Sequence, residues 1–294
     1  MLILIFGPPS GFVQWCLWLI RVMTDVALVE VDYASASNTD QLRDFWAKRH
    51  KPNVFFFADC PNRRLVDVFT QVNAPILILW EKPEDVTAFI MRERNLAFLW
   101  SWRLNMQCSM TFADYFLLPL TLVLRRQEQS NIENLLRVVA EHFRIALEPE
   151  HLVEIERRIR ASKGLELGHS VEEAFLASWP TSLPRGGGLE GVPVELARVG
   201  DDLHRRLDAL SYGGTFDEMV VERELFIPGG DPHGYLMGPI DMVGPARCIV
   251  YGPFLYLPVG DWVADLRFRL DENYSGNVLE VDVFHGEVLV SESF

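Results

Sequence analysis

The chain begins with MLILIFGPPSGFVQWCLWLIRVM (residues 1–23), in which a Gly-Pro-Pro-Ser-Gly segment separates two apolar runs. The first run is short and continuous, as is typical of a strand buried on both faces. The second run has the length of a helix, and the prolines between the runs argue against one unbroken membrane-spanning helix. No basic residue precedes Arg21, so the signal-peptide pattern is absent. The stretch therefore predicts a strand, a loop and a helix in a cytoplasmic protein.

Apolar runs and amphipathic helices alternate over roughly the first hundred residues. Strands are predicted at 1–6, 26–31, 53–58 and 74–80, and helices at 12–23, 39–49, 63–72 and 83–94. This alternation predicts an α/β fold, with a parallel sheet, right-handed crossovers and flanking helices. Helices without further strands are predicted at 97–124, 131–145, 148–162, 169–177 and 201–210.

The 294 residues carry a net charge of −14, and this charge is unevenly distributed. Residues 1–160 contain 18 Lys and Arg against 19 Asp and Glu, whereas residues 201–294 contain 6 against 17. Together with a Gly- and Pro-rich stretch, this shift predicts an α/β domain at 1–177, a linker with a short helix at 178–218 and a small β-sandwich at 219–294. The acidic C-terminal part argues against a nucleic-acid partner, which requires a basic surface.

The hydropathy pattern has period two in the C-terminal part. Residues 262–270 and 278–284 alternate apolar with polar side chains, which predicts half-buried antiparallel strands. A turn at His285-Gly286 is predicted to lead into a last strand at 288–290. The last edge of that sheet would be open unless a partner strand or the N-terminal domain covers it, so the pattern is consistent with a shortened domain or with a homodimer that pairs there.

Cysteines and histidines show no spacing that is typical of a metal site. Cys16, Cys60, Cys108 and Cys248 lie far apart, which predicts buried thiols in a reducing compartment. The seven histidines contain no HxxxH pattern, so no metal is expected.

The loop after the first predicted strand resembles the phosphosulfate loop of sulfotransferases, G-x-P-R/K-S-G-T/S. LILWEKPED (77–85) is similar to the family's vvRnPrDv segment, and EHFRIALEPEHLVEI (141–155) is similar to its late helix pair. The resemblance covers roughly residues 1–160. It implies a sulfotransferase-like P-loop fold that binds 3′-phosphoadenylyl sulfate or adenosine 3′,5′-bisphosphate. The implied cofactor-binding residues are Gly7, Pro8, Pro9, Ser10, Gly11 and Phe12.

The chain departs from the sulfotransferase pattern at the positions that hold the donor. Pro9 replaces the basic residue of the loop, and Phe12 replaces the hydroxyl residue that follows it. Glu81 stands where the family has the Arg that binds the 3′-phosphate, and Phe89 stands where it has a Ser. A carboxylate repels a phosphate that an arginine would bind as a charge-assisted pair. Either the donor is not the usual one, or the site is inactive.

Other charged residues follow the predicted strands, where ligands of such sheets bind. We favour a structural role for each of them, because helix ends and turns commonly carry exposed charges. No Walker lysine is present, so a P-loop kinase is not supported. The alternative candidates are Lys82, Arg92, Arg94, Arg63 and Arg64, with His50 and Asp59 as general bases.

RCIVYGPFLYLPVGDWVADLRFRL (247–270) resembles a β-sandwich module of bacterial glycosyltransferases and other polysaccharide-synthesis proteins, which reads YGPY-x-x-LP-x-G-x-Y. The resemblance implies a glycan or a glycosyltransferase as partner. Exposed aromatic rings offer flat amphipathic faces for sugar binding, although such rings also fill small cores. The candidate carbohydrate-binding residues are Tyr251, Phe254, Tyr256 and Trp262.

Two functions therefore remain open. The first is a sulfotransferase-like enzyme of bacterial surface-polysaccharide synthesis that transfers a sulfuryl group to a sugar. The second is a catalytically inactive P-loop scaffold whose β-sandwich binds a glycan or a partner protein.

Overall fold

The computed structural model describes residues 1–179, 192, 194, 198–199, 201–214, 218–231, 234–255, 257, 260–271, 276, 278–284 and 288–293, except for the side chains of residues 63 and 66. The chain divides into two compact units, Met1–Pro258 and Val259–Phe294, and each is described by itself. The domain boundaries at 177 and 219 stay a prediction, and most of the linker lies outside the described residues.

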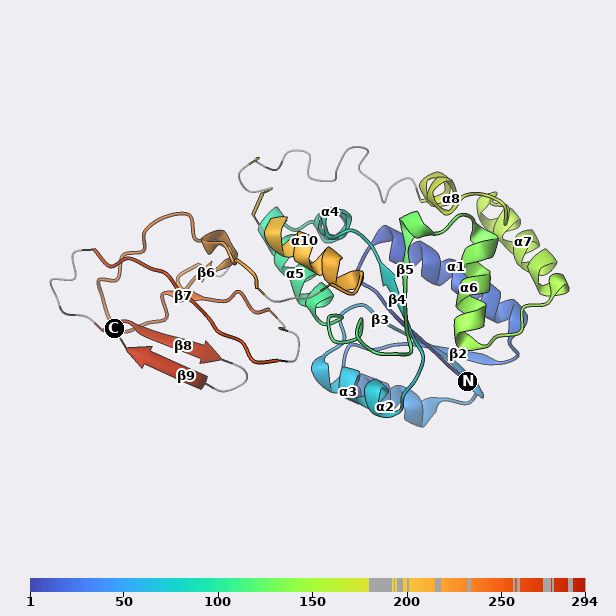
Figure 1. The fold of residues 1–294 in the computed structure, drawn as a ribbon, viewed down its shortest axis with the longest axis horizontal. Helices are drawn as coiled ribbons and strands as arrows, with labels where there is room; N and C mark the ends of the chain where they lie inside the picture. The colour runs from blue at the N-terminus through green and yellow to red at the C-terminus, as the bar shows by residue number, and fades with distance from the viewer. Residues whose placement is uncertain are drawn as a thin grey trace. The chain divides into compact units, whose positions relative to one another are not determined.

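The first unit is built on a five-stranded parallel sheet in the order β2-β3-β1-β4-β5 (Figure 1). Every neighbouring pair of strands is parallel, with Leu4 of β1 beside both Phe56 and Ile76. The predicted α/β class is therefore confirmed. The strands are β1 (Leu2–Phe6), β2 (Val31–Ser35), β3 (Asn53–Ala58), β4 (Ile76–Trp80) and β5 (Thr121–Arg125).

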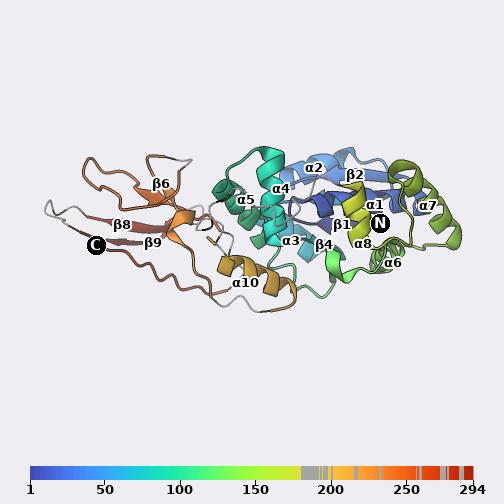
Figure 2. The ribbon, with the colours of Figure 1, turned by 90° about the horizontal axis from the view of Figure 1, so that it is seen from above.

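Helices cover both faces of this sheet. The chain passes from β1 to β2 in one direction and from β2 through β3 to β4 in the other, so right-handed crossovers place α1 opposite α2 and α3. Figure 2 shows α2 and α6 on opposite sides of the sheet. None of the described helices combines the length and hydropathy needed to cross a membrane. The helices are α1 (Gly11–Ala27), α2 (Thr39–Lys48), α3 (Arg63–Gln71), α4 (Pro83–Arg94), α5 (Phe98–Met110), α6 (Ile132–Phe143), α7 (Pro149–Lys163), α8 (Val171–Ser178) and α10 (Asp201–Ser211).

Two elements predicted for the first unit were wrong. The strand predicted at 26–31 begins only at Val31, because Val26 continues α1 and packs against the apolar core. The helix predicted at 97–124 ends at Met110, and β5 follows it. The five residues of β5 pair along the whole of β4 and form an edge of the sheet. The helical pattern that precedes β5 is the reason why the sequence did not predict this strand.

A short antiparallel sheet joins β6 (Ile227–Pro228) to β7 (Val250–Tyr251) within the first unit. The 3-10 helix η3 (Arg223–Leu225) precedes it, and the buried Arg103 of α5 anchors this segment. The Arg103 guanidinium donates through Nε to the Leu225 carbonyl at 3.1 Å and through Nη2 to the Phe226 carbonyl at 3.0 Å. The segment is thereby fastened to the α/β core.

The second unit contains an antiparallel hairpin of β8 (Glu280–Phe284) and β9 (Val288–Ser293), which confirms antiparallel strands in this part of the chain. The strand predicted at 262–270 was wrong, because the described residues there form no strand and Val263 is 96% exposed. Among the residues that the structure describes, no third strand pairs with the β8–β9 hairpin. The predicted turn at His285-Gly286 lies outside those residues.

Candidate functional site

The loop between β1 and α1 forms the predicted strand–loop–helix. Ser10 adopts an extended backbone conformation and caps α1, with its Oγ accepting from the Val13 N–H at 3.1 Å. Gly7 lies where β4 comes closest, since a Cβ there would stand 2.7 Å from the Leu79 carbonyl oxygen. This close approach requires glycine.

The same loop is covered by its own chain. Ser10 is only 1% exposed, and Gly7, Pro8, Gly11 and Phe12 are buried. The Phe12 ring meets the edge of Phe175 of α8 at 5.8 Å between centroids. A helix N-terminus binds an anion through free backbone N–H groups, and most of the loop residues that precede and begin α1 are buried.

Helix α8 is fixed over the first turns of α1 by a second contact. Trp15 Nε1 donates to Ser178 Oγ at 2.8 Å, and the Trp15 and Phe175 rings pack edge to face at 6.0 Å. One end of α8 therefore rests on apolar rings and a hydrogen bond. Its other end reaches an arginine.

Arg126 follows β5 directly, opens the 3-10 helix η1 (Arg126–Glu128) and gathers three carboxylates. Its Nε lies 2.9 Å from Glu172 Oε2, its Nη2 lies 3.3 Å from Asp85 Oδ2, and its Nη1 lies 3.5 Å from Glu81 Oε2. The Arg126 and Glu81 side chains are 8% and 4% exposed. We call these four residues the Arg126 cluster.

The surroundings of Glu81 in the Arg126 cluster change its pKa. Burial raises its pKa to about 8, the Arg126 guanidinium lowers that pKa, and the carboxylates of Asp85 and Glu172 raise it. Its contact to Arg126 is also the longest of the three. Glu81 therefore keeps a proton at neutral pH, and the Arg126 guanidinium also lies close to the carboxylates of Asp85 and Glu172.

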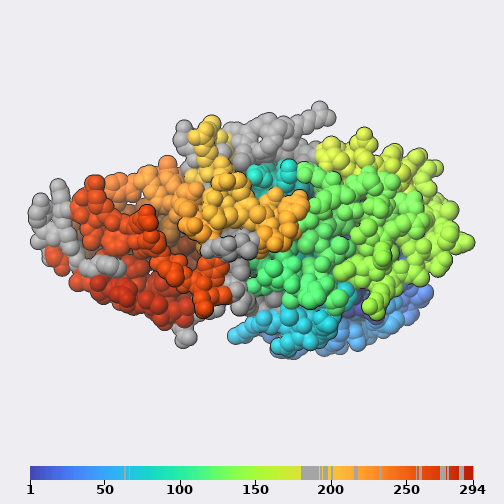
Figure 3. All heavy atoms as spheres, in the orientation of Figure 1, coloured from blue at the N-terminus to red at the C-terminus, as the bar shows by residue number. Residues whose placement is uncertain are grey.

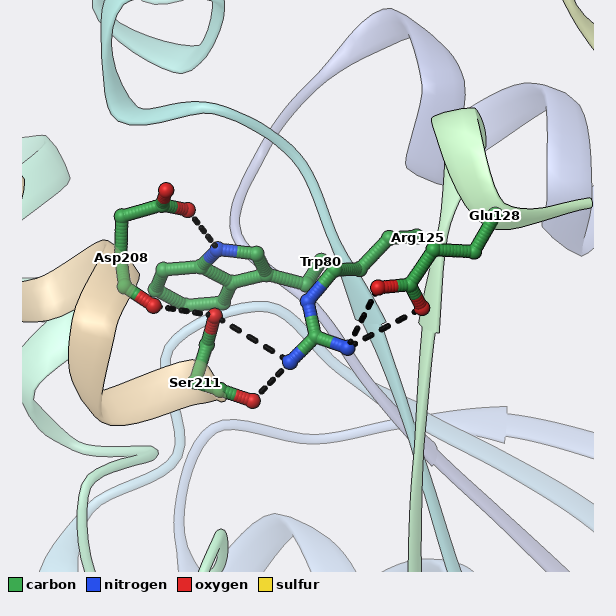
Figure 4. Close-up of polar contacts among 5 residues, drawn as sticks. All are labelled: Trp80, Arg125, Glu128, Asp208 and Ser211. Carbon is green, nitrogen blue, oxygen red and sulfur yellow. Dashed lines mark hydrogen bonds and ion pairs between the residues drawn. The ribbon is translucent and has the colours of Figure 1, made fainter. Parts of the chain in front are cut away.

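Helix α10 is fastened to the ends of β4 and β5 (Figure 4). Trp80 Nε1 donates to Asp208 Oδ1 at 3.2 Å, and Arg125 Nη2 donates to the Ser211 backbone oxygen. The Arg125 guanidinium also lies 3.8 Å from the Tyr212 ring centroid. In the space-filling view, α10 lies against the green segment that includes β5 (Figure 3). These contacts leave a pocket of about 220 Å³ lined by Trp80, Glu81, Lys82, Arg125, Arg126, Gln127, Asp208 and Tyr212.

A second pocket, of about 330 Å³, opens at the carboxyl ends of β2 and β3. We call it the β2–β3 pocket. Of the candidates that the sequence suggested, only Asp59 lines it. Its lining residues are Ser35, Ala36, Ser37, Gln41, Phe57, Ala58 and Asp59.

The structure brings few of the other candidates together. Lys82 lines the pocket below α10, whereas Phe89 is buried within α4. His50, Arg64, Arg92 and Arg94 are exposed, and the Arg63 side chain lies outside the described residues. Sequence reasoning missed Arg125 and Arg126, although two arginines after the apolar run TLVL are the signal of a strand that ends at a ligand edge.

The aromatic candidates divide between the two units. In the first unit, the Tyr251 and Phe254 rings lie 5.8 Å apart, and Phe254 is 52% exposed. Trp262 is half-buried in the second unit, and Tyr256 lies outside the described residues.

The cysteines are free thiols in different surroundings. Cys16 and Cys108 are buried and Cys60 is half-buried, but the prediction of burial is wrong for the exposed Cys248. The Cys60 and Cys108 thiols are hydrogen-bonded, and this contact together with burial raises the pKa of Cys108. Within the described residues, no group of three or more His, Cys, Asp or Glu side chains is arranged to hold a metal.

Comparison with known proteins gives one kind of match. No protein-family model and no curated protein sequence matches the chain. Among solved structures, the chain is similar to the crystal structure of mouse sulfotransferase SULT7A1 complexed with PAP. The sequence identity is 12%, the match covers 72% of this chain and 88% of that chain, and the TM-score is 0.43. The fold class rests on the strand order and pairing described above.

Proposed function

We propose that this protein is a sulfotransferase-like scaffold of bacterial surface-polysaccharide synthesis, which binds a glycan and does not use the usual sulfate donor. The single observation that carries the proposal is the Arg126 cluster, in which three carboxyl groups of the chain itself surround the buried Arg126 guanidinium. The resemblance of residues 247–270 to a module of polysaccharide-synthesis proteins supplies the biological setting.

The electrostatics of the cluster oppose a phosphate. With Glu81 protonated, Asp85 and Glu172 still outnumber the one guanidinium, so an added anion meets a net negative charge. Within the described residues, Arg126 Nε and Nη1 make no hydrogen bond, but both lie close to carboxyl oxygens of the chain, so an added anion would compete with Glu81 and Glu172 for the guanidinium. The covered loop adds to this, because Ser10 uses its hydroxyl to cap α1.

Glycan binding is supported by the aromatic pair of Tyr251 and Phe254. Phe254 keeps half of its surface exposed beside the Tyr251 ring, although exposed aromatic surface is costly in water. Such a ring pair offers an apolar face to a sugar. Trp262 is a separate candidate sugar-binding ring in the second unit.

Two binding experiments with the full chain test the proposal. Isothermal titration calorimetry with adenosine 3′,5′-bisphosphate is expected to show no binding. Affinity electrophoresis in gels that contain a neutral polysaccharide is expected to retard the wild type, and Phe254→Ala is expected to lose the retardation. Tyr235→Ala removes another exposed ring of the first unit that lies outside the motif, so it is the matched control.

Sulfuryl transfer is the second candidate function. The observation in its favour is the pocket of about 220 Å³ where Lys82, Arg125 and Arg126 meet at the carboxyl ends of β4 and β5. Binding of adenosine 3′,5′-bisphosphate that is lost in Gly11→Trp would establish this function and overturn the scaffold proposal.

We further propose that the protein works in the cytoplasm and forms a homodimer through the β8–β9 hairpin of the second unit. Apolar side chains of β8 and β9, including Phe284 and Leu289, are exposed there. Sedimentation velocity tests the dimer, which Leu289→Glu is expected to dissociate. A wild-type monomer at all concentrations would refute it.

A further inference from the structure

The β2–β3 pocket has a firmly held wall. The Ser37 N–H donates to Gln41 Oε1 at 2.9 Å, and the Ser37 carbonyl accepts from the Asn62 N–H at 2.9 Å. The Ala36 N–H donates to the Phe57 carbonyl at 3.3 Å. The chain after β2 is therefore held to both α2 and the end of β3. A pocket with such walls is formed before a ligand arrives.

Polar groups in this pocket lack partners of their own. Within the described residues, the hydroxyls of Ser35 and Ser37 and the carboxylate of Asp59 make no hydrogen bond or ion pair with one another or with the rest of the chain. The Gln41 side chain uses its oxygen for Ser37 and leaves its amide donors available. Donors and acceptors thus alternate around one small space, which suits a ligand with many hydroxyls.

The charge of the pocket limits the ligand further. Asp59 is the one charged residue among those that line it. A carboxylate repels phosphate, sulfate and carboxylate groups, so the pocket does not suit the sulfate donor or an acidic sugar. The half-buried Phe57 ring adds an apolar face. A volume of about 330 Å³ lies at the small end for ligand pockets and suits one sugar ring.

We propose that the β2–β3 pocket binds one uncharged sugar unit, with Asp59 accepting hydrogen bonds from two of its hydroxyls and Phe57 facing its C–H surface. The inference rests on the proposed function for the class of ligand. It differs in place, because the proposed function assigns glycan binding to Tyr251, Phe254 and Trp262. The open side of the pocket lets a longer chain continue into solvent.

Calorimetric titration of the full chain with cellohexaose and mannohexaose tests the inference. Asp59→Asn is expected to weaken binding of the preferred oligosaccharide about tenfold, since it replaces a charged acceptor by a neutral one. Ser37→Trp is expected to abolish binding by filling the pocket. Asp44→Asn makes the same charge change on the exposed face of α2, outside the pocket, and is expected to bind as the wild type does.

Three outcomes would overturn the inference. They are wild-type affinity in both Asp59→Asn and Ser37→Trp, tighter binding of trigalacturonate than of the neutral probes, and tighter binding of spermidine, which would make the pocket a cation site. Phe254→Ala in the same titrations separates the two proposals. If Phe254→Ala alone loses binding, this inference fails and the proposed function stands, whereas loss in Asp59→Asn alone gives the opposite result.

Discussion

The two halves of the sheet's carboxyl edge differ in how their polar groups are satisfied. At the ends of β1, β4 and β5, the Arg126 cluster and the contacts of α8 and α10 bring polar and charged groups of the chain together, although Arg125 Nε, Arg126 Nε and Arg126 Nη1 make no hydrogen bond with the part of the chain that the structure describes. At the ends of β2 and β3, the β2–β3 pocket leaves hydroxyls and a carboxylate open. We call the part of the edge at β1, β4 and β5 the closed half. The loop that resembles a phosphate loop follows β1 and therefore lies in the closed half.

The cause of the difference is what each strand is followed by. Helices α2 and α3 start soon after β2 and β3 with Asn38 and Asn62 as caps, and among the described residues no later segment lines the β2–β3 pocket. The ends of β4 and β5 are instead covered by α8 and α10, which come from later in the chain. Loop sequence alone therefore does not establish a ligand site, because later segments decide whether the loop is reached.

Removal of the Arg126 guanidinium is expected to lower the free energy of unfolding more than any other change to the closed half. Arg126→Met leaves Glu81, Asp85 and Glu172 without their shared partner, which is expected to cost about 3–5 kcal/mol of unfolding free energy. Urea unfolding followed by circular dichroism measures it. Arg157→Met breaks an exposed ion pair with Glu154 and is expected to cost less than about 1 kcal/mol. Equal costs would show that the cluster adds nothing.

The protonated Glu81 makes the closed half sensitive to alkali. Its pKa rises from 4.5 in the unfolded chain to about 8 in the folded one, so the folded state binds the extra proton between these values. The resulting stability is fully present below pH 4.5 and is lost as pH rises through about 8, a change of up to a few kcal/mol.

Glu81→Gln tests this pH dependence, because an amide keeps the shape of the neutral acid. The variant is expected to unfold at a higher urea concentration than the wild type at pH 9 and to lack most of the decline between pH 5 and 8. Parallel stability curves for the two proteins would mean that Glu81 is ionised throughout.

The close approach of β4 at Gly7 gives an intermediate effect. In Gly7→Ala the new Cβ meets the Leu79 carbonyl oxygen at 2.7 Å, and moving a strand costs about 1–3 kcal/mol. Gly168→Ala is the control, since its Cβ would have no neighbour within 4 Å. Thermal unfolding should separate the two variants, and an undisturbed midpoint in Gly7→Ala would contradict the close packing.

The smallest effect is expected where α10 meets β4. Trp80→Phe keeps the apolar ring and removes the hydrogen bond to Asp208, at a cost of about 1 kcal/mol. Hydrogen exchange of the α10 amides is expected to accelerate, while that of β1 stays slow. Trp46→Phe, an exposed ring on α2, is the control. If α10 exchanges at the wild-type rate, the bond does not hold this helix.

Local pattern was sufficient for much of the fold. The apolar runs of β1, β3 and β4 can be read from the sequence itself, because burial on both faces of a sheet requires apolar residues. β5 was missed since its five residues follow a helical pattern without a break that sequence reasoning recognised. Arg126 was missed with it, because its role depends on the end of that strand.

The candidate site was predictable only in part. The comparison with the sulfotransferase pattern singled out Glu81, yet its partners Arg126 and Glu172 come from distant segments. The ring contact of Phe12 likewise depends on Phe175, which lies far along the chain from the loop. Spacing along the chain shows which residues share a strand end, whereas burial and pairing follow from the packing of remote elements.

Arg103 has a consequence for how this protein can be dissected. Its buried guanidinium donates to the carbonyls of Glu224, Leu225 and Phe226. A fragment that stops before residue 224 would leave that charge without acceptors inside the fold, which folded proteins rarely tolerate. The smallest autonomous piece that carries the parallel sheet must therefore extend at least through Phe226, well past the last helix.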